Sequence, residues 1–174
     1  MTILFLGDSL IEYHDWQEEL PEHRVANLGV AGESVQGLLC RVVKIKDAFP
    51  AADMLFLMSG INNVAMGDLE FIPFYDMILE KLEIFYPLAG IFVHSLLPAA
   101  VEFIPADAVR HINTSLRRLA EKRGVRYVDI HRRFVDSTGS VIREYLSLDG
   151  VHLSRAGYEI WAALIGSIVK GSSF

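Results

Sequence analysis

Short apolar runs alternate with longer segments of helical periodicity along almost the whole chain. Each run has the length and composition of a β-strand, most of them buried on both faces, and the runs occupy residues 3–6, 25–28, 54–58, 91–93 and 125–128. Apolar residues at helical spacing fill the segments 35–45, 72–85, 109–119 and 161–168. Strands joined by helical crossovers pair in parallel. The pattern therefore predicts a three-layer α/β/α sandwich around a five-stranded parallel sheet.

The size and composition of the chain suit one packed domain. It has 174 residues, 52% of them hydrophobic, and no linker or repeat divides it, so we expect a single domain over residues 1–174. Acidic residues (22) outnumber basic ones (16), and no run of Lys and Arg is longer than a pair. Since such a chain offers no footprint for a phosphate backbone, we do not expect nucleic acid as a partner.

Signals for a cofactor or a compartment are few. The single cysteine, Cys40, excludes an intramolecular disulfide and a cysteine-rich zinc site, and it fits a reducing, cytoplasmic environment. The N-terminus lacks the basic region of a signal peptide. Proline and glycine interrupt the uncharged stretch 84–101, so no transmembrane segment is expected.

Metal and nucleotide motifs are also missing from the sequence. No phosphate-binding glycine motif is present. No metal-ligand spacing relates the histidines outside the C-terminal motif, which are His14, His23, His94, His111 and His131. We therefore expect neither a metal nor a cofactor. Among these histidines, His94 follows a predicted strand, where a side chain can contact a substrate.

Polar residues follow the predicted strands at the edge where open parallel sheets bind ligands. Gly7-Asp8-Ser9 comes after the first strand and directly before a predicted helix over residues 10–20. A serine nucleophile at this position gains from the N–H groups of the helix N-terminus. The same tripeptide also suits a turn followed by a helix cap, so both interpretations stay open.

A second motif lies before the last predicted helix, where Asp149 precedes His152 by three residues. This spacing lets the carboxylate hold the Nδ1–H of the imidazole, as a catalytic base requires. An Asp-Gly turn with an incidental histidine is the alternative. The loop 27–34 and the segment Gly60-Ile61-Asn62-Asn63 supply N–H groups for an oxyanion, although the second is also compatible with a simple turn.

Taken together, these four segments resemble the SGNH, or GDSL-type, hydrolases, which implies a flavodoxin-like fold. The resemblance covers nearly the whole chain and rests on the order, the spacing and the strand-end position of the blocks. The matching residues are Gly7-Asp8-Ser9-Leu10, Gly32, Gly60-Ile61-Asn62-Asn63 and Asp149-Gly150-Val151-His152.

The resemblance implies a role for each matching residue. Ser9 would be the nucleophile, His152 the base and Asp149 the group that orients it. The oxyanion donors would be the N–H of Ser9, the N–H of Gly32 and the side chain of Asn62. The third block often reads Gly-x-Asn-Asp, whereas here Asn63 takes the last place, as in the intracellular platelet-activating-factor acetylhydrolase subunits.

The resemblance implies a serine esterase that hydrolyses carboxylic esters or thioesters through an acyl-enzyme, with a small-molecule ester as substrate. A carbohydrate O-deacetylase would use the same residues, and a non-catalytic binding module on this fold is a further alternative. Short predicted loops leave no room for a lid, so we expect short to medium acyl groups. The loop around residues 96–105 is expected to line a shallow groove or to form a homo-oligomer contact, through Leu96, Leu97, Val101 and Phe103.

Overall fold

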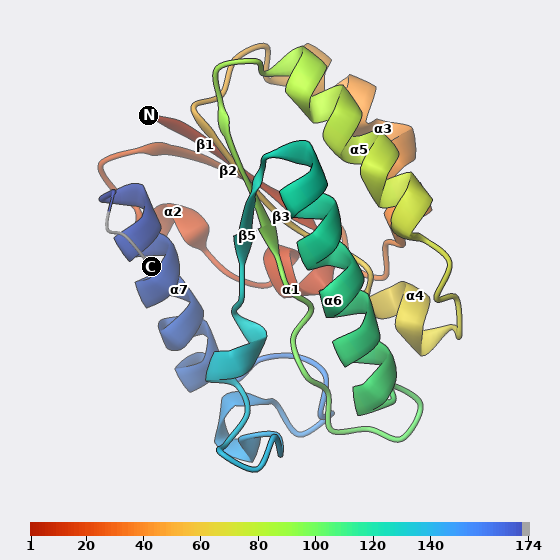
Figure 1. The fold of residues 1–174 in the computed structure, drawn as a ribbon. Helices are drawn as coiled ribbons and strands as arrows, with labels where there is room; N and C mark the ends of the chain where they lie inside the picture. The colour runs from red at the N-terminus through yellow and green to blue at the C-terminus, as the bar shows by residue number, and fades with distance from the viewer. Residues whose placement is uncertain (172–174) are drawn as a thin grey trace.

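The computed structural model describes residues 1–171 and contains a five-stranded, wholly parallel sheet (Figure 1). The strand order is β2-β1-β3-β4-β5, which is the flavodoxin-like order. The strands are β1 (Thr2–Gly7), β2 (Arg24–Gly29), β3 (Met54–Met58), β4 (Gly90–His94) and β5 (Arg126–Val128). They overlap all the predicted apolar runs, and the predicted fold class is confirmed.

The strand register brings the ends of three strands together. Gly7 at the end of β1 pairs with Gly29 of β2 and with Met58 of β3. Because these strands are parallel neighbours, the segments that follow them leave the sheet at one edge. The residues after β1, β2 and β3 include every predicted oxyanion donor.

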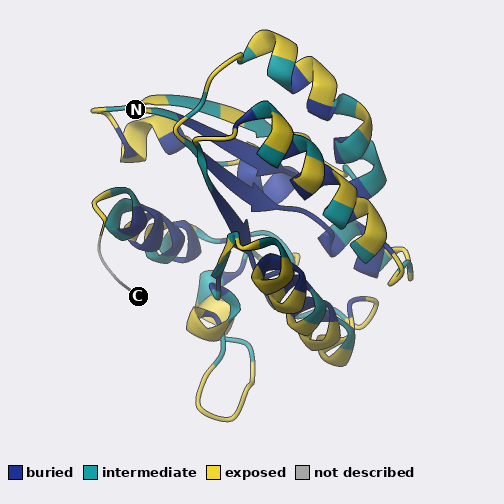
Figure 2. Cartoon of the chain, turned by 45° about the horizontal axis from the view of Figure 1, so that its top comes forward, coloured by how far each residue is buried: buried dark blue, intermediate teal, exposed yellow. Residues whose placement is uncertain are grey.

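Helices cover both faces of the sheet. α3 (Val35–Ala48), α5 (Ile72–Phe85) and α6 (Ala106–Arg123) contact one another in sequence along one face. The short α1 (Ser9–Glu12) and α2 (Trp16–Glu19) and the C-terminal α7 (Arg155–Val169) cover the other face. In Figure 2 the central strands are largely buried, and the helices are buried toward the sheet and exposed outward, which is the pattern of amphipathic crossover helices.

Aromatic side chains form the core between the sheet and α7. Phe5 stacks on Trp16 at a centroid distance of 4.4 Å and on Phe56 at 5.0 Å. Trp16 packs edge-on against Trp161 of α7 at 4.9 Å. All four side chains are fully buried. This packing holds the segment after β1 against the C-terminal helix. The predicted site residues Ser9 and His152 lie next to these two elements.

The predicted helix over residues 10–20 is wrong, because two short helices stand there instead. The Asp15 side chain caps the second of them by accepting hydrogen bonds from the N–H groups of Gln17 and Glu18. The Nδ2 of Asn27 donates to the carbonyls of Ile11, Glu12 and His14. Tertiary hydrogen bonds therefore take the carbonyls that a continuous helix would use internally.

Two further expectations differ from the structure. His94 is fully buried between the rings of Phe56 and Trp161, so it has no access to a substrate. Burial lowers its pKa to about 3. Leu96 and Leu97 belong to the core and do not line a groove. Cys40 is exposed on α3.

The connections at the site edge hold only short helices. After β3 comes α4 (Ile61–Ala65), and the long segment between β5 and α7 holds only the 3₁₀ helices η1 (His131–Arg133) and η2 (Arg143–Tyr145). Within residues 1–171, no helix has the length and apolar character that crossing a bilayer requires.

Candidate active site

Ser9 is the first residue of α1 and lies directly after the turn that ends β1. Asp8 caps this helix, since its Oδ1 accepts a hydrogen bond from the N–H of Leu10 at 3.1 Å. The turn needs glycine at position 7, because a Cβ there would lie 1.9 Å from the carbonyl oxygen of Met58 on β3. The Ser9 residue is 7% exposed. Its hydroxyl thus faces the strand-end edge from a rigid helix start.

His152 binds the Ser9 hydroxyl, although 143 residues separate the two. The distance from Nε2 to Ser9 Oγ is 2.9 Å, and the distance from Nδ1 to Asp149 Oδ2 is 2.7 Å. With the ring proton on Nδ1, the imidazole donates to the carboxylate and accepts from the hydroxyl. The structure therefore brings the three predicted residues into one hydrogen-bonded chain. His152 lies in the turn before α7, which begins at Arg155.

The turn around Asp149 holds the carboxylate in its charged form. Its Oδ1 accepts hydrogen bonds from the N–H groups of Val151 and His152, both at 2.9 Å. These bonds, first that of Val151, and the His152 side chain lower the pKa of Asp149 to about 2. Gly150 takes a φ of +72°, a conformation that favours glycine, and its carbonyl accepts from the N–H of Ala100 at 2.7 Å.

Three N–H donors lie at the ends of β1, β2 and β3. Gly32 has a φ of +75° in the loop after β2. Within residues 1–171, the N–H groups of Ser9 and Gly32 have no protein acceptor. Asn62 on α4 donates one Nδ2 hydrogen to the carbonyl of Glu33 at 3.0 Å. This bond joins Asn62 to the residue after Gly32 and leaves its second amide hydrogen for a ligand.

A known protein family also matches this chain. Residues 5–160 match the model of the GDSL-like lipase/acylhydrolase family. The chain belongs to this family. It is therefore an ester-hydrolysing enzyme, and its Gly7-Asp8-Ser9 turn and its His152 motif both lie inside the matched range.

Solved structures share the fold of this acylhydrolase. A protein from Streptococcus pneumonia named for platelet activating factor is 26% identical, with a TM-score of 0.84 over 95% of this chain and 82% of that one. A lipase/acylhydrolase from Enterococcus faecalis is 18% identical, with a TM-score of 0.78 over 98% and 95%. An acetyl xylan esterase from Geobacillus stearothermophilus is 22% identical, with a TM-score of 0.75 over 92% and 90%. No curated protein matches the sequence significantly.

An ion pair holds the Gly32 loop of the acylhydrolase against the sheet. Arg41 binds both carboxylate oxygens of Glu33, at 2.6 and 2.7 Å. The same guanidinium donates to the carbonyl of Leu28, at 2.6 Å, and to that of Gly7. The loop is therefore anchored to the ends of β1 and β2. Sequence patterns did not point to Arg41, because its partners come from three separate segments.

Asp8 differs in charge from Asp149, although both lie beside the Ser9–His152 pair. Asp8 is fully buried, and its Oδ2 has no partner among the described residues. Burial raises its pKa to about 7, against the opposing effects of the Leu10 N–H and of His152. Burial therefore disfavours the charged form of Asp8, whereas Asp149, whose pKa is lowered, is the charged group that binds the imidazole.

Tyr13 packs against the ring of His152 and was not predicted to belong to the site. Its ring lies 5.2 Å from that of His152, and the residue is 58% exposed. Tyr13 follows Ser9 by four residues, a spacing that places both on one face of a helical turn. That spacing is the signal by which Tyr13 could have been found from sequence.

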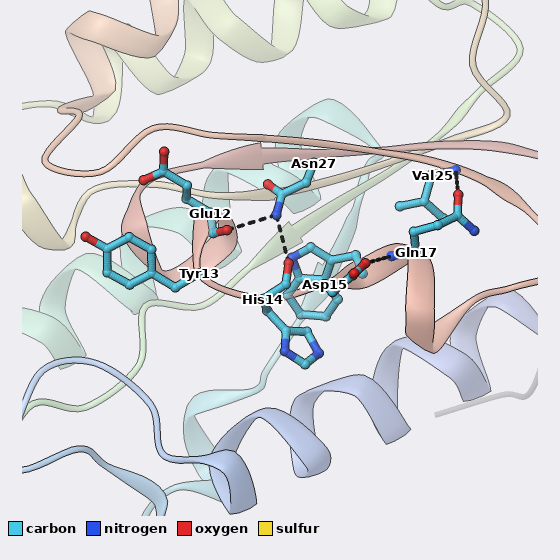
Figure 3. A pocket seen from close by; sticks show the side chains of 8 residues that line it. Glu12, Tyr13, His14, Asp15, Gln17, Val25 and Asn27 are labelled. Carbon is cyan, nitrogen blue, oxygen red and sulfur yellow. Dashed lines mark hydrogen bonds between the residues drawn. The ribbon is translucent and has the colours of Figure 1, made fainter.

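A groove of about 490 Å³ is lined by residues of the α1–α2 segment and of β2 (Figure 3). Its polar groups bind one another: Asn27 holds backbone carbonyls of that segment, and Gln17 Oε1 accepts from the N–H of Val25 at 3.1 Å. These contacts cover the outer edge of β2.

No group of three or more His, Cys, Asp or Glu side chains within residues 1–171 is placed to hold a metal ion.

Proposed function

We propose that this acylhydrolase is a serine esterase that forms an acyl-enzyme on Ser9. His152 acts as the base, Asp149 orients it, and the oxyanion donors are the N–H of Ser9, the N–H of Gly32 and the side chain of Asn62. The single observation that carries the proposal is the hydrogen-bonded chain from Ser9 Oγ through His152 to Asp149, at 2.9 and 2.7 Å.

The first half of the reaction follows from this geometry. The Nε2 of His152 removes the hydroxyl proton while Ser9 Oγ attacks the ester carbonyl carbon. The negative charge that develops on the carbonyl oxygen is bound by the three N–H donors. When the tetrahedral intermediate collapses, His152 gives its proton to the leaving atom, which is oxygen in an ester and sulfur in a thioester. The alcohol or thiol departs, and the acyl group stays on Ser9.

Hydrolysis of the acyl-enzyme uses the same groups in reverse. Water enters beside His152, gives a proton to Nε2 and attacks the acyl carbon. The intermediate then releases the carboxylic acid and returns the proton to Ser9. The charge of Asp149, whose pKa is lowered to about 2, stabilises the imidazolium in both halves of the reaction.

A fluorophosphonate probe is expected to label the enzyme on Ser9. Only a serine activated by a base and an oxyanion site attacks such a probe at a useful rate. The measurement is the mass of the intact protein and of the peptide that contains Ser9, with Ser9→Ala as the unlabelled control. A folded protein that takes up no probe would favour the non-catalytic binding module.

The structure supports short or medium acyl groups as substrates. The segment after β3 holds only the five-residue α4, and the loop after β4 contains no helix. Leu96 and Leu97, which were expected to line a groove, are buried in the core. Phe103, in the loop after β4, is 62% exposed and therefore forms no wall of an enclosed tunnel. An open rim cannot surround a long acyl chain and exclude water from it.

The ratio kcat/KM for p-nitrophenyl esters is therefore expected to peak between the acetyl and hexanoyl esters. The palmitoyl ester should gain nothing over the hexanoyl ester, because each further methylene stays in water and contributes none of the roughly 0.8 kcal/mol that burial supplies. Ser9→Ala gives the background rate at each length. A steady rise through the long chains would show an enclosed acyl tunnel.

Carbohydrate O-deacetylation is a second candidate. It is favoured by the shared fold of two acetyl xylan esterases, with TM-scores of 0.79 and 0.75, and by the open site, which suits a bulky leaving group. Release of acetate from acetylated xylan, compared with release from p-nitrophenyl acetate, separates this candidate from a general esterase.

A further inference from the structure

Asn63, Gln36 and Asp68 form a closed set of hydrogen bonds beside the oxyanion loop, which we call the Asn63 triangle. Asn63 is fully buried. Its Nδ2 donates to Gln36 Oε1 at 2.7 Å and to Asp68 Oδ2 at 2.8 Å. The Nε2 of Gln36 donates to the same Oδ2 at 3.0 Å. None of the three groups takes part in the reaction proposed above.

The triangle is connected to the oxyanion loop through one backbone group. The Oδ1 of Asn63 accepts a hydrogen bond from the N–H of Val35 at 2.9 Å. Val35 begins α3, three residues after Gly32. The neighbouring Asn62 binds the carbonyl of Glu33. Two consecutive residues of α4 therefore hold the loop at two points, and they relate the position of the Gly32 N–H to that of the Asn62 amide.

The carboxylate of Asp68 and the N–H of Val35 together fix which way the Asn63 amide faces. A carboxylate only accepts hydrogen bonds, so the amide must turn its Nδ2 toward Asp68 and its Oδ1 toward Val35. The reverse orientation would bring two N–H groups together at a buried position, which is costly. The hydrogen bonds from Gln36 and Asn63 lower the pKa of Asp68, so its charge persists in mildly acidic solution.

We propose that Asp68 is a positioning residue for the oxyanion donors, acting through the Asn63 amide and the Val35 N–H. The inference rests on the proposed function, since the loop position matters for catalysis only if Gly32 and Asn62 bind the oxyanion. It also gives a physical reason for asparagine at the last place of the third block. The carboxylate stands at Asp68, and an amide at position 63 is needed to donate to it.

Asp68→Ala is expected to lower kcat by about tenfold and to change KM by less than about twofold, because misplaced donors weaken binding of the transition state alone. The rate of fluorophosphonate labelling should fall by a similar factor, since the phosphonyl oxygen uses the same donors. Glu70→Ala, which removes a nearby exposed carboxylate, is the matched control and should leave both rates unchanged. A lower melting temperature with unchanged kcat would mean a purely structural role and would overturn the proposal.

Exchanging the two groups tests the charge directly. Asn63→Asp places two carboxylates where the 2.8 Å bond now lies. We expect kcat at pH 8 to fall more than about tenfold and to recover toward pH 5, where the pair shares a proton. The double variant Asn63→Asp/Asp68→Asn again pairs one carboxylate with one amide. Its kcat should return to within about threefold of the wild-type value at both pH values.

The groups that bind the exchanged pair, Asn63 and Asp68, do not titrate, because they are the Gln36 amide and the N–H groups of Val35 and Glu70. Asp8 and the Glu33–Arg41 pair, on the neighbouring strand end and loop, are present in every variant, so each rate is divided by the wild-type rate at the same pH.

A double variant whose kcat is no higher than that of Asn63→Asp would refute the coupling between Asn63 and Asp68. If Asn63→Asp does not fold, Asp68→Ala and the double variant still decide. Retained activity in Ser9→Ala would instead refute the proposed function.

Discussion

Ser9→Ala and His152→Ala are each expected to lower kcat for ester hydrolysis by about 10⁴-fold or more. Without Oγ no acyl-enzyme forms, and without the imidazole nothing removes the hydroxyl proton at neutral pH. Because the 2.9 Å bond makes the two groups one functional unit, the double variant should be little worse than either single variant.

The measurement is kcat with p-nitrophenyl acetate, together with thermal unfolding of each variant. Ser9 is small and lies at a helix start, and alanine there should leave the melting temperature nearly unchanged. Ser137→Ala, at an exposed serine outside the site, is the matched control. If Ser9→Ala kept more than about a tenth of the wild-type kcat, another residue would be the nucleophile.

Asn62→Ala is expected to lower kcat by about 10² to 10³ while KM changes little, which is the effect of losing one oxyanion donor. The bond from Asn62 Nδ2 to the Glu33 carbonyl fixes the amide in place, so its second hydrogen is oriented before the substrate arrives. A donor fixed in this way acts on the charge that develops in the transition state and adds little to binding of the neutral ester.

Asn63→Ala serves as the comparison because its side chain has different neighbours. It would leave the Val35 N–H and the Asp68 carboxylate without their partner, and it should lower the melting temperature more than Asn62→Ala does. Parallel measurement of kcat and thermal unfolding separates the two amides. A change confined to KM in Asn62→Ala would show that Asn62 binds the substrate and does not act on the oxyanion.

The fold of this acylhydrolase was largely predictable from sequence, since burial imposes a local pattern. A strand covered on both faces, such as β3, must be apolar throughout, and a crossover helix such as α5 must be apolar along one side. These patterns extend over neighbouring residues and are read without knowing the tertiary contacts. The prediction of one helix over residues 10–20 was wrong because Asn27, on β2, binds the carbonyls that would have continued the helix.

For the site, the sequence alone determined the candidates Ser9, Asp149 and His152. Ser9 stands directly after a strand and a glycine turn, where a side chain can reach a ligand, and Asp149 precedes His152 by the spacing that lets a carboxylate orient an imidazole. Only the tertiary structure decided which groups support them: the Arg41–Glu33 pair and the Asn63 triangle join segments with no common periodicity. The physical reason is that a hydrogen bond depends on the distance and direction between two atoms. Those quantities exist only after the sheet has brought distant segments of the chain together.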